Sequence, residues 1–188
     1  MKKIWLICMF VLLNACSFRS PQSQFYVMNS DGIDALSSKN MSVSVTKVKV
    51  PDMLDKSQML IYDKDSAEVQ ILEFHRWAEI LPDTIQTTAV NDLIAYLPNA
   101  YIKRTYFHDA SLQYSVNIEI NNLKAYTDDK VVLTAWWKIS DKSGKVLKRE
   151  QRTYIAKVQK SGVPALVEAQ AETVHQMTRD ISEHLLRL

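Results

Sequence analysis

Two stretches in the second half of the chain alternate strictly between apolar and polar residues, and this pattern constrains the fold most. Successive strand side chains point to opposite faces of a sheet, so residues 111–121 and 131–139 each predict a strand with one buried and one wet face. That arrangement is typical of an antiparallel sheet covered on one side. The apolar positions are Leu112, Tyr114, Val116, Ile118 and Ile120 in the first stretch, and Val131, Leu133, Ala135, Trp137 and Ile139 in the second.

Shorter signals indicate further strands on either side of this pair. The turn sequence Asp-Lys-Ser-Gly at residues 141–144 predicts a hairpin into a strand over residues 145–156. Earlier strands are predicted by short β-rich runs at residues 25–28, 41–50, 59–62 and 69–72.

Helical patterns occur at two places, after the early strands and at the end of the chain. Residues 82–97 begin with a proline and carry an apolar stripe every fourth residue; residues 163–186 carry a similar stripe. We therefore predict a single α+β domain, a mainly antiparallel sheet with two helices packed on one face. Its element order is four strands, a helix, four strands and a helix.

The N-terminus predicts a lipoprotein signal peptide. Lys2 and Lys3 are followed by an apolar run over residues 4–13, which is too short to span a bilayer because spanning takes about 20 residues. The stretch 13–16, Leu-Asn-Ala-Cys, resembles the bacterial lipobox. We expect acylation of the Cys16 thiol, with an ordinary secreted protein as the alternative interpretation.

This interpretation divides the chain into three parts. Residues 1–15 are the signal peptide, residues 16–24 are a lipidated tether, and residues 25–188 are the single domain. Ser17 rather than aspartate follows the cysteine, and this resembles lipoproteins sorted to the outer membrane. We therefore expect lipid anchoring at the periplasmic face of the outer membrane, with no cofactor other than the covalent lipid on Cys16.

Composition excludes several classes of function. The formal net charge is +2, and two of the positive charges, Lys2 and Lys3, leave with the signal peptide, so no basic field predicts nucleic-acid binding. The only cysteines are Cys8 and Cys16, so the domain has no disulfide or thiolate site. The chain has 3 glycines, each at a predicted turn or helix start, so we expect neither a phosphate-binding loop nor a nucleotide.

The histidines do not form a recognisable catalytic or metal-binding set. Glu172 and His175 have a helical spacing that serves some metal sites, but a site would need ligands from the other helix, which offers only Asp83 and Asp92. A serine with His108 and Asp109 leaves a periplasmic hydrolase as a lesser alternative. We expect no enzyme and no metal.

The aromatic residues suggest contacts with a partner. Trp136 and Trp137 are adjacent in a predicted strand, so their rings must point to opposite faces. Trp137 shares the apolar face, and Trp136 stands on the polar face, either covering aliphatic stems or contacting a partner. Arg76, Trp77 and Glu79 predict a packed corner with a solvated ion pair before the first helix.

Several segments, in order along the chain, resemble the PqiC/YmbA-like family of ABC-type transport auxiliary lipoproteins. They are SQFYVMNS, VKVPDMLDKSQMLIY, HRWAEILPDTIQ with NDLIAYLP, and VVLTAWWKISDKSGKVL. The resemblance covers essentially the whole mature chain. One departure is Ile80, where the family often has proline.

The resemblance implies an auxiliary protein that binds an MCE-domain protein of an intermembrane lipid transporter and supports envelope integrity. We expect Arg76, Trp77, Glu79 and Trp136 to be partner-binding residues, and association into a homo-oligomer is consistent with multimeric MCE assemblies. The alternative is a structural lipoprotein of another outer-membrane assembly machine, of the lipopolysaccharide or Tol-like kind.

Overall fold

The computed structural model describes residues 21–188 of the chain. The predicted signal peptide and the predicted acylation site, Cys16, lie outside the described residues. No helix within residues 21–188 is both long enough and apolar enough to cross a membrane.

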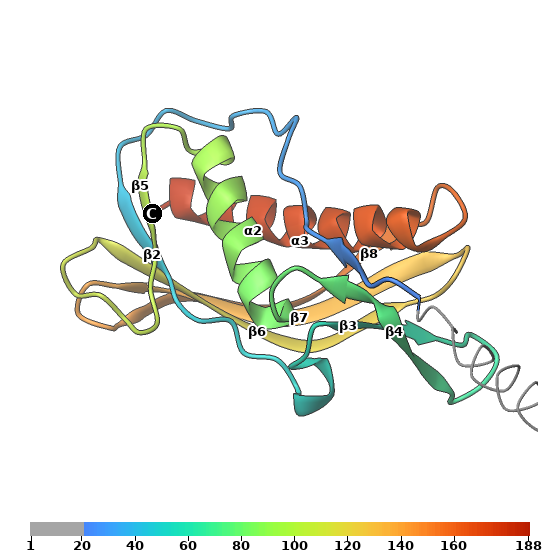
Figure 1. The fold of residues 1–188 in the computed structure, drawn as a ribbon. Helices are drawn as coiled ribbons and strands as arrows, with labels where there is room; N and C mark the ends of the chain where they lie inside the picture. The colour runs from blue at the N-terminus through green and yellow to red at the C-terminus, as the bar shows by residue number, and fades with distance from the viewer. Residues whose placement is uncertain (1–20) are drawn as a thin grey trace, which may run out of the picture.

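The structure confirms the α+β class and the order of elements (Figure 1). Four strands and a short 3-10 helix precede the helix α2, and four strands lie between α2 and the final helix α3. The elements are β1 (Gln24–Tyr26), β2 (Ser42–Val45), η1 (Asp52–Leu54), β3 (Gln58–Tyr62), β4 (Val69–Trp77), α2 (Leu81–Tyr96), β5 (Tyr101–Arg104), β6 (Tyr114–Ala125), β7 (Lys130–Asp141), β8 (Val146–Lys157) and α3 (Val163–Leu186).

The strands form two mixed sheets, which refines the prediction of a single, mainly antiparallel one. The large sheet has the order β5-β2-β6-β7-β8, and the small sheet has the order β1-β4-β3. The long strands β6, β7 and β8 are antiparallel neighbours, as predicted, whereas β2 runs parallel to both β5 and β6. In the small sheet β1 is parallel to β4, and β3 is antiparallel to it.

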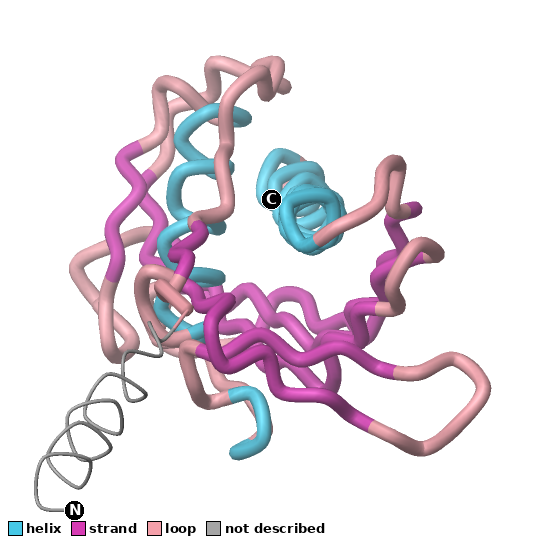
Figure 2. Tube along the Cα trace, turned by 45° about the vertical axis from the view of Figure 1, so that its right-hand side comes forward, coloured by secondary structure: helices cyan, strands magenta, loops and turns pink. Residues whose placement is uncertain are grey.

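Both helices cover the same face of the large sheet. Helix α3 lies along β7 and β8, and α2 packs on α3 and on β5. Figure 2 shows the large sheet curving around α3. The predicted apolar positions of β7 all face this side, from Val131 to Ile139, and each is at most 1% exposed.

Polar contacts tie the helices to the sheet and to one another. The Gln86 side chain of α2 is 1% exposed and donates to the backbone carbonyls of Val45 and Thr105, which lie at the ends of the parallel strands β2 and β5. Between the helices, the buried Asp92 carboxylate accepts hydrogen bonds from His175 at 2.8 Å and from Thr178 at 2.6 Å. Within residues 21–188, neither α2 nor α3 covers the other face of the large sheet, which we call the open face.

Candidate functional site

The adjacent tryptophans of β7 point to opposite faces of the large sheet, as the sequence predicts. Trp137 is 1% exposed, and its Nε1 donates to the Tyr154 hydroxyl at 3.0 Å. Trp136 is 39% exposed on the open face, directly between Glu119 of β6 and Gln151 of β8. The open face therefore presents a large amphipathic ring among polar neighbours.

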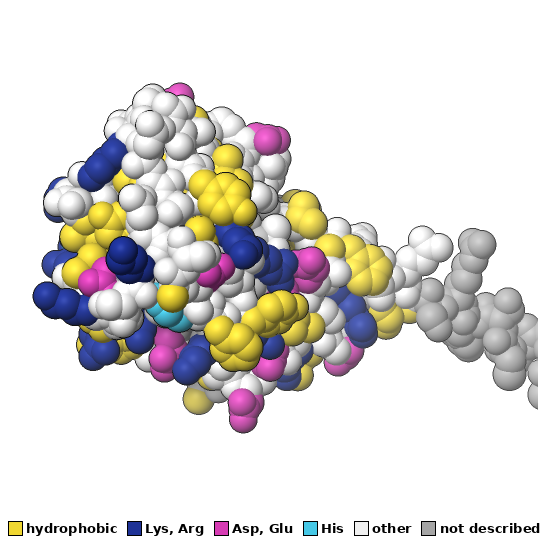
Figure 3. Space-filling model, turned by 90° about the vertical axis from the view of Figure 1, so that its left-hand side faces the viewer, with side chains coloured by type: hydrophobic (Ala, Val, Ile, Leu, Met, Phe, Trp, Pro, Cys, Tyr) yellow, Lys and Arg dark blue, Asp and Glu magenta, His cyan; other side chains and the backbone are white. Residues whose placement is uncertain are grey.

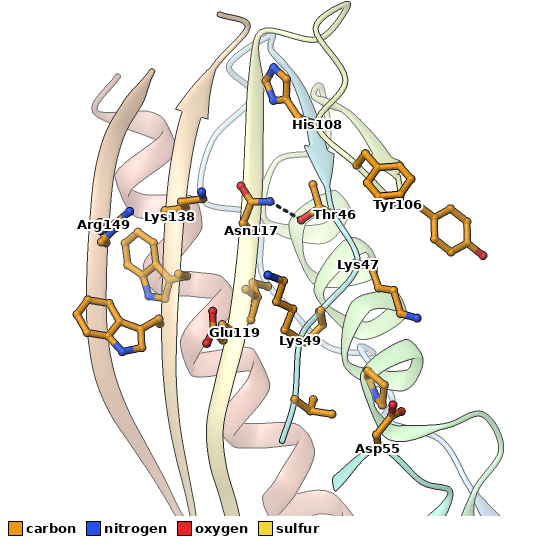
Figure 4. A pocket seen from close by; sticks show the side chains of 17 residues that line it. Thr46, Lys47, Lys49, Asp55, Tyr106, His108, Asn117, Glu119, Lys138 and Arg149 are labelled. Carbon is orange, nitrogen blue, oxygen red and sulfur yellow. Dashed lines mark hydrogen bonds between the residues drawn. The ribbon is translucent and has the colours of Figure 1, made fainter. Parts of the chain in front are cut away.

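Trp136 lies in a groove of about 930 Å³ that runs across the open face (Figure 4). The groove extends over β6, β7 and β8, the segment that follows β2, and the loop between β5 and β6. We call this cavity the groove. Its lining residues are Thr46, Lys47, Val48, Lys49, Val50, Asp55, Pro82, Tyr106, Phe107, His108, Asn117, Ile118, Glu119, Trp136, Trp137, Lys138 and Arg149.

The groove is rich in cations that lack carboxylate partners. None of its four Lys and Arg side chains forms an ion pair with another residue in the range 21–188. Elsewhere on the domain such pairs are common, as between Arg152 and Asp180 at 3.1 Å or Arg104 and Asp83 at 2.9 Å. Figure 3 shows Lys and Arg side chains interspersed with hydrophobic ones on the end of the molecule that lies at the left of Figure 1. The cations of the groove are Lys47, Lys49, Lys138 and Arg149.

Two of these cations lie directly opposite each other across neighbouring strands. Lys138 of β7 is the register partner of Arg149 of β8, and Figure 4 shows the two side chains on the same side of the groove. Like charges in directly opposed positions of an antiparallel pair are destabilising. An anion bound between them would remove that repulsion.

The loop between β5 and β6 forms the aromatic rim of the groove. Tyr106 is 69% exposed and Phe107 is 83% exposed. The imidazole of the next residue, His108, hydrogen-bonds the Lys142 carbonyl at 3.1 Å and so attaches this loop to the β7–β8 turn. Hydrogen bonds from Ser111 and from Lys103 lower the pKa of Asp109 to about 2, so this carboxylate is ionised at neutral pH.

The predicted Arg76–Glu79 corner has a different geometry from the one expected. Residues 74–77 belong to β4 rather than to a connection, and Arg76 pairs with Glu73 at 3.5 Å instead of with Glu79. The Glu79 carboxylate accepts a hydrogen bond from Thr87 of α2. Trp77 is 2% exposed and belongs to the core, so of these residues only Arg76 and Glu79 are on the surface. None of them lines the groove.

The residues considered for hydrolysis do not assemble within the described chain. His108 contacts a backbone carbonyl and Asp109 binds Ser111 and Lys103, and no hydrogen bond joins the two. No group of three or more metal-ligand side chains occurs in residues 21–188.

His175, considered as a metal ligand with Glu172, instead pairs with Asp92 across the interface between the helices. Burial lowers the pKa of His175, but the hydrogen bond to Asp92 and the charge of that carboxylate outweigh burial and raise it above 6.5. The pair therefore joins α3 to α2 and is part of the fold.

Sequence reasoning identified Trp136 but missed the rest of the groove. Lys138 and Arg149 become neighbours only through strand pairing, and the segment 47–49 reaches the other side of the groove only because the chain after β2 runs parallel to β6. The available signal was the surplus of lysine and arginine on the polar face of the predicted hairpin.

Comparison with known proteins places the chain in a family. A family model for the ABC-type transport auxiliary lipoprotein component matches residues 32–182, so the chain belongs to this family. This confirms the resemblance found in the sequence. A search of curated proteins finds no match.

Two solved structures have the same fold at low sequence identity. One, an uncharacterized protein, is 19% identical with a TM-score of 0.73, covering 88% of this chain and 99% of its own. Protein XCC0632 from Xanthomonas campestris, described as a DUF330 protein, is 13% identical with a TM-score of 0.68, covering 87% and 95%.

Proposed function

We propose that this chain is an outer-membrane lipoprotein that binds an MCE-domain protein as the auxiliary component of an intermembrane lipid transporter, and so supports envelope integrity. The observation that carries the proposal is membership of the ABC-type transport auxiliary lipoprotein family. In this proposal, Cys16 carries the lipid and the domain contributes binding rather than catalysis.

The geometry of the domain fits such a role. Trp136 and its groove offer a binding surface on an open sheet face, and tryptophans concentrate at the centres of protein interfaces. The described chain begins at Pro21, five residues after Cys16, and five residues extend over at most about 18 Å. An acylated Cys16 would therefore hold the domain close to its membrane.

The first experiment is affinity purification of the full-length lipoprotein from detergent-solubilised envelopes. We expect the MCE-domain protein to be recovered with the wild type and to be strongly reduced with Trp136→Ala. Ile155→Ala is the matched control, because Ile155 is 53% exposed on the neighbouring strand and does not line the groove. Recovery of a β-barrel assembly or a peptidoglycan-linked partner instead of an MCE protein would contradict the proposal.

The anchor has its own test. Cys16→Ala removes the thiol that would be acylated, so we expect the variant to lose its acyl mass and to appear in the soluble fraction. Membrane association of the variant after a high-salt wash would argue against anchoring through Cys16.

A further inference from the structure

We infer that the groove binds an acidic segment of a partner protein, in which carboxylates accompany an apolar side chain. Lys138 and Arg149 would bind one carboxylate, and Trp136, two residues from Lys138 on β7, would contact the apolar side chain next to it. Lys47 and Lys49, on the far side of Glu119, would attract a second carboxylate. This inference deepens the proposed function and rests on it in one respect, namely that the occupant is a protein.

The first support is the charge arrangement. Lys138 and Arg149 are direct cross-strand neighbours, and neither has a carboxylate partner in the described part of the chain. Arg152 and Lys148, on the same strand as Arg149, both form ion pairs. A carboxylate that binds a guanidinium and an ammonium together makes charge-assisted hydrogen bonds, which are about twice as strong as neutral ones.

The second support is the distribution of charge across the groove. Figure 4 places Arg149 and Lys138 on one side and Lys47 and Lys49 on the other, with the Glu119 carboxylate between them and the Asp55 carboxylate on the side of Lys47. Glu119 is also directly opposite Trp136 in the strand register. The middle of the groove thus disfavours a carboxylate. Trp136 and the Lys138–Arg149 pair lie together on the side that has no lining carboxylate of its own, and this side favours a carboxylate next to an apolar group.

The size and position of the groove favour a protein segment. A volume of about 930 Å³ with an aromatic rim greatly exceeds the needs of a small inorganic anion. The described chain begins beside β4, at the right of Figure 1, whereas the loop that carries Tyr106 and Phe107 lies at the left end of the molecule. A membrane that holds the chain at its start therefore lies away from this rim, and a protein arriving from the opposite direction meets it.

The test is site-specific photocrosslinking in intact envelopes, with the full lipidated protein. A benzophenone amino acid replaces Trp136, and in the control it replaces Ile155 on the same sheet face. We expect a crosslink from position 136 only, to a segment with at least two carboxylates within a few residues of an apolar side chain. A crosslink to phospholipid, to a segment without carboxylates, or to nothing at all would overturn the inference.

Charge reversal provides the second arm. With the crosslinker at position 136, Lys138→Glu or Arg149→Glu should reduce the crosslink at least tenfold. The thermal midpoint should stay the same or rise, because each substitution replaces a repulsive cross-strand pair with an attractive one. Lys157→Glu is the matched control: Lys157 also opposes a lysine, Lys130, at the other end of the same strands but outside the groove. This control should leave the crosslink unchanged, and an equal loss in all three variants would refute the groove as the site.

The two arms separate this inference from the proposed function. If the MCE protein copurifies but no acidic segment crosslinks at position 136, the inference fails and the proposed function stands. If an acidic segment of a different protein crosslinks there, the inference stands and the proposed function fails.

Discussion

The adjacent tryptophans of β7 allow one substitution to be compared at two neighbouring positions with opposite expected outcomes. Trp137→Ala removes a ring that is 1% exposed and whose Nε1 hydrogen-bonds the Tyr154 hydroxyl. Truncating a buried tryptophan to alanine costs about 3–5 kcal/mol, because the apolar surface is lost and a cavity remains. In a domain of this size each kcal/mol lowers Tm by roughly 2–4 °C, so we expect a fall of about 6–20 °C.

Trp136→Ala should behave differently because this ring is 39% exposed on the open face. It loses contacts with Glu119 and Gln151 across the strands, and such cross-strand pairs contribute about 0.2–1 kcal/mol. With two such pairs, each contributing at most about 1 kcal/mol, we expect Tm to fall by at most about 8 °C. Binding of the partner should fall strongly, since the groove loses its central aromatic surface.

The assay is thermal unfolding of both purified variants, followed by far-UV circular dichroism, alongside the envelope purification. Ile155→Ala serves as the control for binding, because Ile155 is exposed and lies outside the groove, whereas Trp137 is one of the residues that line it. Equal destabilisation by the two substitutions would show that Trp136 is a core residue. A stable Trp136→Ala that binds normally would refute the role assigned to the groove.

Three further predictions concern the polar contacts that hold the helices in place. Asp92→Ala leaves His175 without its buried partner and should lower the free energy of unfolding by about 3 kcal/mol in urea titrations, as expected when one member of a buried pair is removed; an unchanged midpoint would contradict this. The pKa of His175 is raised above 6.5 in the folded state, so its stabilising contribution is complete below pH 6.5 and lost as the pH rises through the folded pKa. Urea titrations from pH 5.5 to 9 should show that loss in the wild type and less of it in Asp92→Asn. Gln86→Ala leaves the Val45 and Thr105 carbonyls without their side-chain donor and should cost about 1–3 kcal/mol, with a midpoint within error of the wild type as the refuting result.

The parts of the fold that could be predicted from sequence are those in which the signal is local. The alternation in β6 and β7 identifies the face that packs on the helices, and the adjacency of Trp136 and Trp137 assigns their rings to opposite faces. The alternation does not predict that Ser115, on the opposite face, is also buried. The final helix was also predicted within a residue, because its apolar stripe spans many turns. In each case the pattern depends only on the geometry of a single element.

The unpredicted parts depend on pairing between distant segments. β5 has four residues, only one of them partly buried, so no alternation marks it. It becomes a strand because it pairs in parallel with β2, about sixty residues earlier in the chain. The division into two sheets has the same origin: β3 and β4 form a local hairpin, but their separation from β2 reflects tertiary packing. Local propensity carries no information about either arrangement.

The electrostatic character of the groove depends on a single bulged residue. The pairing of β7 with β8 shifts by one between Ile139 and Ser140, which leaves Leu147 without a register partner. A shift of one residue exchanges the two faces of a strand. Without the shift between Ile139 and Ser140, Glu150 would lie opposite Trp136 on the open face, and Arg149 would lie on the face that packs on the helices.

The observed register instead puts Arg149 on the open face and Arg152 on the face that packs on the helices. It places Arg149 in the groove beside Lys138, and it turns Arg152 toward α3, where it pairs with Asp180. The turn sequence at residues 141–144 is compatible with either register, so the groove could not be predicted from the sequence of the hairpin alone. The same register buries Tyr154 and Ala156 on the inner face, where the Tyr154 hydroxyl donates to Asp180 of α3. On the open face it leaves Lys138 and Arg149 without a carboxylate partner among residues 21–188.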